Sequence, residues 1–149
     1  MRDKTDTIIS LDAVSLTLPG PGKQAVPILH DINLQVQRGE TISVVGPSGS
    51  GKTSLLMLIA GVEKASSGRL EVAGQDITDM SEDELSAFRH QHVGVVFQNF
   101  HLIPTMTALE NVSVALEFAG YADAGGEAGK WLQKVGLSER IDHYPEQLS

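Results

Sequence analysis

The sequence contains no cysteine and few aromatic residues, namely four Phe, two Tyr and one Trp. The absence of cysteine excludes disulfide bonds, thiol catalysis and metal sites built on thiolates. Lys and Arg number 11 against 19 Asp and Glu, which gives a formal net charge of -8. Such a chain offers neither the basic surface nor the stacking platforms that nucleic-acid-binding proteins use, so we expect no nucleic-acid partner.

Long apolar stretches are also missing. The longest nearly continuous one, residues 55–62, is far shorter than the roughly 20 residues that a membrane-spanning helix needs. Residues 1–6 are polar with charges of both signs, unlike the start of a signal peptide. With 149 residues, of which 41% are hydrophobic, the chain has enough apolar material for one packed domain. Any membrane role should therefore be peripheral.

The first third of the chain is mostly β in pattern. β-Branched residues and alternation predict strands over residues 7–18 and 28–36, separated by a loop rich in Pro and Gly at 19–22. Residues 41–45 are a short apolar run typical of a buried parallel strand. Residues 52–60 are apolar nearly all round, as expected of a buried helix beside such a sheet.

A glycine-rich segment joins this strand to this helix. Residues 46–53, Gly-Pro-Ser-Gly-Ser-Gly-Lys-Thr, satisfy the phosphate-binding pattern G-x-x-x-x-G-K-[ST] in full. The glycines let backbone N–H groups surround a phosphate at a helix N-terminus, where the helix dipole favours negative charge. A turn that merely connects strand and helix is disfavoured, because Lys and Thr must also fall at fixed places. The predicted nucleotide-binding residues are Gly46, Pro47, Ser48, Gly49, Ser50, Gly51, Lys52, Thr53 and Ser54.

Two of these residues have assigned chemistry. Lys52 would reach the β- and γ-phosphates, and the Thr53 hydroxyl would bind Mg²⁺. Hydrolysis also needs a carboxylate after a second apolar strand and a group that polarises water. The sequence shows no such strand: residues 93–97 form a buried-type strand but end in Gln98, which carries no charge. Residues 112–117 look like an apolar strand ending in a carboxylate. A helix is favoured there because a capping box begins at Thr107.

Capping boxes mark the starts of two helices after the P-loop. Each is a Ser or Thr followed three residues later by Glu, and they predict helices that begin at Ser81 and Thr107 and reach about residues 89 and 119. A third helix is expected over residues 127–135, after a loop at 120–126, with Gly136 as its end. Residues 69–73 alternate as a further strand.

These motifs occur in an order that resembles the ATP-binding subunits of ABC transporters. Residues 95–98, Val-Val-Phe-Gln, look like the Q-loop of the family, and residues 102–112 are similar to the run L-x-P-x-x-T-x-x-E-N-V that follows it. Leu148-Ser149 looks like the start of the signature motif. Within the family the chain most resembles the ATPases of the lipoprotein-releasing, macrolide-efflux and related exporter group. Polar amino-acid importers carry a very similar Q-loop run, so both subgroups stay open.

The resemblance implies a fold and a function. The fold is α/β, a P-loop NTPase core with an N-terminal antiparallel β segment and part of a helical subdomain, with residues 1–100 in the core and 101–149 in the subdomain. ATP and Mg²⁺ are the implied cofactors, and the intact protein would couple ATP hydrolysis to transport. Transmembrane subunits and a second ATP-binding subunit are the implied partners, at the cytoplasmic face of the inner membrane.

The resemblance also implies roles for single residues. Lys52 and Gln98 would act in catalysis, and Thr53 and Gln98 would contact the metal. The aromatic side chain that stacks on adenine in the family should fall near Leu18, which offers an apolar face without π-stacking. The sequence ends at Ser149, before the family's remaining catalytic motifs, so it looks like an N-terminal fragment that binds nucleotide without turnover.

Residues 99–106 form an irregular, partly apolar loop after Gln98. Phe100, Leu102, Ile103 and Pro104 either pack the joint between the two parts of the chain or, as the resemblance implies, dock a cytoplasmic helix of the membrane subunit.

Other readings of the sequence are weaker. A P-loop GTPase is disfavoured because no N-K-x-D tetrapeptide occurs and a long β-rich segment precedes the P-loop. A chromosome-maintenance ATPase would insert long heptad coiled coils after the Q-loop, whereas residues 107–135 suggest two short helices. His90 and His92 are interpreted as solvated helix-end residues and the acidic residues 82–84 as a helical first turn, rather than as metal sites.

Overall fold

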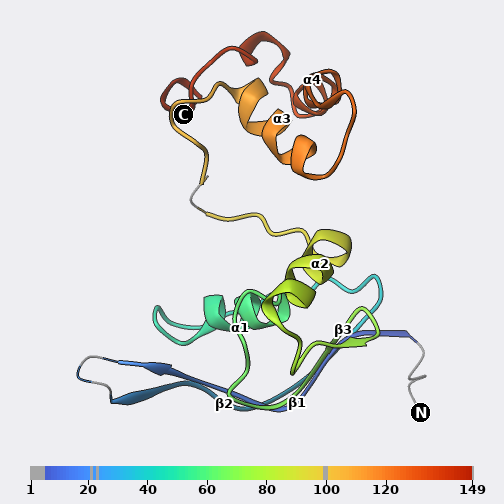
Figure 1. The fold of residues 1–149 in the computed structure, drawn as a ribbon. Coiled ribbons are helices and arrows are strands. Elements are labelled where there is room, and N and C mark those ends of the chain that lie inside the picture. The colour runs from blue at the N-terminus through green and yellow to red at the C-terminus, as the bar shows by residue number, and fades with distance from the viewer. Residues whose placement is uncertain (1–5, 21, 23, 99–100, 149) are drawn as a thin grey trace. The chain divides into compact units, whose positions relative to one another are not determined.

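The computed structural model describes residues 6–20, 22, 24–98 and 101–148 (Figure 1). The chain divides into two compact units, Met1–Val95 and Val96–Ser149. Within the described ranges, no helix combines the length and apolar character needed to cross a membrane.

The first unit is built on a four-stranded antiparallel sheet. Its strand order is β2-β1-β3-β4, and every pairing is antiparallel. The strands are β1 (Thr7–Pro19), β2 (Ala25–Gln37), β3 (Ser67–Val72) and β4 (Gln75–Asp76). β2 begins three residues earlier than predicted because Ala25, Val26 and Pro27 pair with the end of β1. The predicted antiparallel β segment is therefore confirmed.

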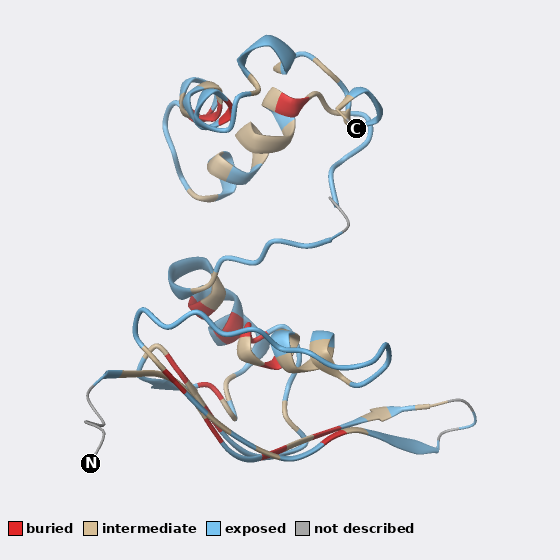
Figure 2. Ribbon diagram, turned by 180° about the vertical axis from the view of Figure 1, so that it is seen from behind, coloured by how far each residue is buried: buried red, intermediate tan, exposed pale blue. Residues whose placement is uncertain are grey.

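Two helices lie on one side of this sheet, α1 (Lys52–Ile59) and α2 (Glu82–His92) (Figures 1 and 2). The core between them and the sheet consists of buried apolar side chains: Leu11, Val14, Leu16, Leu29, Leu58, Leu70, Val72, Ile77, Leu85 and Phe88. In α1 only Leu58 is buried, and Leu56 is exposed. The expectation of a helix buried on all sides is therefore wrong, because only the side that faces the sheet is covered.

The helix α2 starts as the sequence predicts. Ser81 is its N-cap, and both halves of the capping box with Glu84 are formed. The helix runs to His92 rather than to Arg89, and His90 and His92 are exposed residues of its last turn. Arg89 donates a hydrogen bond of 2.6 Å from Nη1 to the carbonyl oxygen of Gly61, which joins α2 to the end of α1.

Two segments predicted as strands have a different conformation. Residues 41–45 and 93–97 form no strand. Most of their apolar side chains face solvent, with Val45 88% and Val96 100% exposed, whereas Val93 is half-buried against the core. A parallel strand receives its backbone hydrogen bonds from neighbouring strands. Within the described parts of the chain, no segment forms a ladder with either stretch. The apolar composition that predicted buried strands is real, but the partners that would bury them are missing from the described residues.

The second unit is helical. It contains α3 (Ala108–Phe118), α4 (Ala124–Lys134) and the short 3-10 helices η3 (Ser138–Arg140) and η4 (Pro145–Gln147). The capping box at the start of α3 is formed, which confirms the helical interpretation of residues 112–117. The buried apolar residues of the second unit are three alanines and one leucine: Ala108, Ala124, Ala128 and Leu132.

The helix α4 starts three residues before its predicted start. The side chain of Asp123 accepts a hydrogen bond of 3.0 Å from the N–H of Gly126, so this N-cap draws two glycines into the first turn. The predicted loop at 120–126 is correspondingly shorter. Gly136, with φ of 78°, follows the helix as expected.

Candidate nucleotide-binding site

The glycine-rich segment forms an exposed turn that leads directly into α1. Gly51 is the N-cap of α1 and has a left-handed φ of 85°. A Cβ at this position would lie 2.9 Å from Leu29 Cδ2 and 3.1 Å from the carbonyl oxygen of Ile28, both on β2. Glycine is therefore favoured at position 51 for two reasons: the backbone conformation disfavours a side chain, and β2 leaves little room for one.

The N-terminus of α1 differs from those of the other helices. No side chain caps it, and its first turn contains no acidic residue, whereas α2 and α3 have complete capping boxes with acidic residues in the first turn. The N–H groups of a helical first turn have no partner within the helix and carry partial positive charge. The start of α1 is thus left open for an external anion, as the sequence predicts for a P-loop.

Lys52 crosses the turn that precedes it. Its ammonium group donates hydrogen bonds to the carbonyl oxygens of Gly46 at 2.9 Å and Pro47 at 2.6 Å, and lies 3.5 Å from Ser50 Oγ. The lysine is thus held over the loop that would contain a phosphate. Thr53 is exposed, and its hydroxyl makes no hydrogen bond within the described part of the chain. A hydroxyl in that state is available to a metal ion.

The other two predicted site residues are placed less directly. Leu18 is half-buried in β1, opposite Val26 of β2, and packs against the core. Gln98 is exposed and belongs to the second unit. It does not end a buried strand, since residues 93–97 form none. Its position relative to the P-loop stays a prediction, and Phe100 lies outside the described residues.

Two structural features of this region could not be predicted from the P-loop motif. The packing of Gly51 on Ile28 and Leu29 joins positions far apart in the sequence, and the hydrogen bonds of Lys52 to loop carbonyls depend on the turn geometry. The alternating pattern of residues 28–36 predicts a strand, but it does not predict that this strand contacts the glycine-rich loop.

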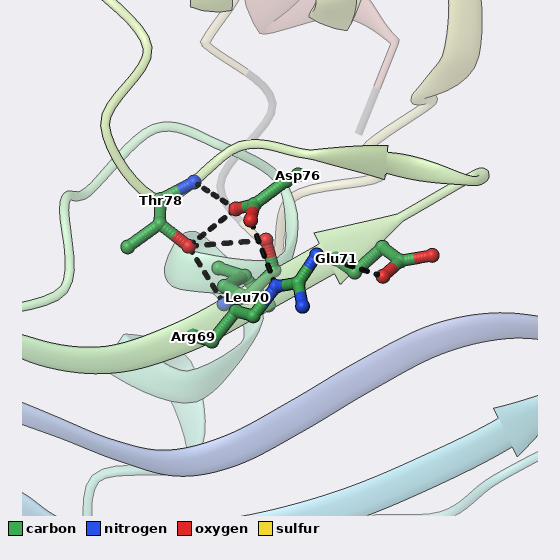
Figure 3. Close-up of polar contacts among 5 residues, drawn as sticks. All are labelled: Arg69, Leu70, Glu71, Asp76 and Thr78. Carbon is green, nitrogen blue, oxygen red and sulfur yellow. Dashed lines mark hydrogen bonds and ion pairs between the residues drawn. The ribbon is translucent and has the colours of Figure 1, made fainter.

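A second polar cluster joins β3 to the segment after β4 (Figure 3). Asp76 accepts hydrogen bonds from the Thr78 hydroxyl at 2.6 Å and the Thr78 N–H at 3.1 Å, and pairs with Arg69 at 2.8 Å. These donors, those of Thr78 first, hold the pKa of Asp76 below its ordinary value. Thr78 Oγ1 in turn accepts from the N–H of Leu70. The cluster fixes a turn of the sheet and suggests no reaction chemistry. Elsewhere in the described residues, no group of three or more His, Asp or Glu side chains is arranged to hold a metal ion.

Comparison with known proteins places this geometry in a family. The sequence model of the family described as ABC transporter matches residues 29–149. The ABC transporter ATP-binding protein YbbA of Escherichia coli (strain K12) is 45% identical over 132 residues, which cover 87% of this chain and 58% of YbbA. The lipoprotein-releasing system ATP-binding protein LolD of Hahella chejuensis is 42% identical, with 86% of this chain and 56% of LolD covered.

Longer proteins and solved structures agree. The macrolide export ATP-binding/permease protein MacB of Bartonella henselae is 38% identical over 98% of this chain and 22% of MacB. A dimeric, post-hydrolysis structure of the ATP-binding cassette MJ0796 bound to ADP and Pi matches with a TM-score of 0.83 and 34% identity, covering 95% of this chain and 63% of that one.

This chain therefore belongs to the ABC transporter family. Its fold is that of an ATP-binding cassette, an α/β P-loop core with an N-terminal antiparallel sheet and helices of a further subdomain. Its relatives include ATP-binding proteins of lipoprotein-releasing and macrolide-export systems. The chain spans somewhat more than half the length of YbbA and LolD.

Proposed function

We propose that the turn 46–51, with Lys52 and Thr53, binds the triphosphate of ATP together with Mg²⁺. The observation that carries this proposal is the start of α1, which has no capping side chain and no acidic residue and follows directly on the P-loop sequence. Family membership supports ATP as the nucleotide, and the similar MJ0796 cassette has been solved with ADP and Pi bound.

Lys52 and Thr53 have distinct parts in this proposal. The ammonium group of Lys52 exchanges the carbonyl oxygens of Gly46 and Pro47 for the oxygens of the phosphates, which carry full negative charge and bind a cation more strongly. The Thr53 hydroxyl and the Gln98 amide are neutral oxygen donors of the kind that Mg²⁺ accepts. Mg²⁺, when bound, would supply positive charge to the phosphates, and the Thr53 and Gln98 side chains would orient the metal ion.

Residues 1–100 form part of the ATP-binding core in this proposal, and residues 101–149 form part of a helical subdomain. The full-length protein hydrolyses ATP and uses the energy to move a substrate across a membrane. The sequence shows no apolar strand that ends in a carboxylate able to hold the metal ion. We therefore propose that these 149 residues bind nucleotide and that turnover requires further groups.

The proposed partners are a second ATP-binding subunit and a membrane subunit. The MJ0796 cassette is dimeric in its solved structures, and MacB joins an ATP-binding part to a permease in one chain. Leu102 and Ile103 are 38% and 41% exposed. We propose that these two side chains dock an apolar face of a cytoplasmic helix of the membrane subunit, which places the full-length protein at the cytoplasmic face of the membrane.

The test is calorimetric titration with ATP and Mg²⁺ of the unmodified protein and of Lys52→Ala. Lys64→Ala is the matched control, because Lys64 is an exposed lysine outside the P-loop. We expect the first variant to lose most of its affinity and the second to bind normally. Equal ATP binding by Lys52→Ala and the unmodified protein would overturn the assignment.

A further inference from the structure

One side chain ties down the loop before α3. The Oδ1 atom of Asn111 accepts a hydrogen bond of 2.8 Å from the N–H of Ile103. Its Nδ2 atom donates to three carbonyl oxygens, those of Ile103 at 3.2 Å, Met106 at 3.0 Å and Thr107 at 3.0 Å. The amide has two N–H bonds, so one of these contacts is shared. A single residue of the helix thus binds the backbone at three positions of the loop.

The loop itself is a closed turn. The N–H of Met106 donates to the carbonyl oxygen of Ile103 at 3.1 Å, and Pro104 occupies the second position of the four-residue turn, where its fixed φ is favoured. Asn111 pairs with both the N–H and the carbonyl of Ile103, much as a neighbouring strand would. The backbone of Ile103 is therefore held from two sides while its side chain stays exposed.

The start of α3 does not require the side chain of Asn111. The first N–H groups of the helix are already satisfied: Ala108 donates to the carbonyl of His143, Leu109 to that of Ile141, and Glu110 to the Thr107 hydroxyl. The backbone N–H of Asn111 makes the ordinary helical bond to Thr107. Its side chain is half-buried and is not among the buried residues of the unit. Three of its four contacts hold Ile103 and Met106 in the loop, and the fourth reaches the carbonyl oxygen of the N-cap residue Thr107.

We propose that Asn111 is a positioning residue that holds the turn 103–106, and with it Leu102 and Ile103, in the conformation that the membrane subunit binds. This inference rests on the docking function proposed above for Leu102 and Ile103. Ordering a loop before binding lowers the entropy that association must overcome, which strengthens binding without adding a contact. Loss of Asn111 should therefore weaken docking although Leu102 and Ile103 keep all their own atoms.

The experiment uses the full-length protein and the detergent-solubilised membrane subunit of its own transporter. Asn111→Ala is compared with Glu117→Ala, a substitution at an exposed position of the same helix. Three quantities are measured: hydrogen exchange of the Ile103 and Met106 amides, affinity for the membrane subunit, and ATP hydrolysis with and without that subunit. Pro104→Gly loosens the same turn without touching Asn111, so it provides an independent variant should Asn111→Ala fold poorly.

We expect Asn111→Ala and Pro104→Gly to speed exchange in the turn and to weaken association about tenfold, with basal ATP hydrolysis unchanged and its stimulation reduced. A merely structural role would lower basal hydrolysis together with stimulation. Normal association by both variants, or unchanged exchange in Asn111→Ala, would overturn the inference. Ile103→Ser tests docking separately: if it binds the membrane subunit normally, the proposed docking function itself is wrong.

Discussion

The ammonium group of Lys52 lies 2.6 Å from the carbonyl oxygen of Pro47 and 2.9 Å from that of Gly46. The charged end of the side chain is therefore turned back into its own loop. In the proposed binding mode, a nucleotide competes with these carbonyl groups for Lys52, and charge-assisted bonds to phosphate offset the bonds that are lost. Substitutions that alter the loop backbone should thus affect nucleotide binding even when Lys52 itself is unchanged.

Gly51→Ala is expected to destabilise the fold more than Gly74→Ala does. Both glycines have a left-handed φ, of 85° and 76°, so both alanines suffer a backbone cost of about 1 kcal/mol. Only at Gly51 would the new Cβ also meet Leu29 and the backbone of Ile28, whereas nothing lies within 4 Å at Gly74. Urea unfolding of both variants measures the difference. Equal losses would show that the contact with β2 does not constrain the loop.

Residues 1–149 alone should bind ATP without releasing phosphate. The sequence has a phosphate-binding motif but no apolar strand that ends in a carboxylate for the metal, and removal of such catalytic groups costs orders of magnitude in rate. A phosphate-release assay on the purified chain checks this, with Lys52→Ala as background. Steady release that disappears in Lys52→Ala would place the catalytic groups within these residues.

Leu18→Tyr should tighten ATP binding by the full-length protein. An aromatic ring that stacks on a base contributes roughly 1 to 3 kcal/mol in nucleic-acid binders, and leucine supplies only apolar contact. Leu18 is half-buried opposite Val26, so a tyrosine would extend along the same partly exposed end of the hairpin. Titration with ATP and GTP measures affinity and base preference. A weaker complex, or strong ATP preference in the unmodified protein, would indicate that another residue binds the base.

Leu102→Ala should weaken association with the membrane subunit and uncouple transport while leaving ATP affinity nearly normal. The residue is 38% exposed, so part of its surface is free to meet a partner. Pull-down with the membrane subunit and a transport assay are the readouts. The alternative, in which this side chain packs the joint between the two parts of the chain, predicts a loss of stability and no change in association. The companion substitution Phe100→Ala lies outside the described residues.

The turn at Asp76 should loosen in acid. Its pKa lies below the ordinary value of 3.8 because Thr78 and Arg69 donate to the charged form. A carboxylate with a lowered pKa in the folded state adds stability at pH values above 3.8, and this contribution is lost as the pH falls through the folded value. Thermal unfolding of the unmodified protein and of Asp76→Asn between pH 3 and 7 measures it. The difference between the two should shrink below about pH 4, and a difference that stays constant would contradict the linkage.

Short-range signals account for most of what the sequence predicted correctly. The capping boxes at Ser81 and Thr107 connect residues three apart, and the turn before α1 follows from its glycines. Strands are different, because each needs a partner. Residues 41–45 and 93–97 have the composition of buried strands but find no ladder among the described residues, so the prediction failed there for a reason outside the segments themselves.

The site shows the same division. The turn before Lys52 and the start of the helix there could be predicted from the residue spacing, whereas the contact of Gly51 with Ile28 and Leu29 joins distant segments. The early start of α4 was missed because Gly125 and Gly126 suggest a loop, and only the hydrogen bond from the Gly126 N–H to Asp123 reveals the cap. The contacts of Asn111 are local. The sequence nevertheless does not show which carbonyl groups an asparagine in the first turns of a helix will bind.

The exposed valines of residues 41–45 and 95–97 have a consequence for handling the protein. Extended segments rich in β-branched side chains, with unpaired N–H and C=O groups, are templates for pairing with identical segments of other molecules. Val45 and Val96 are almost fully accessible to such encounters. Isolated preparations of these 149 residues should therefore self-associate at high concentration. This tendency arises from the two exposed segments rather than from the helices.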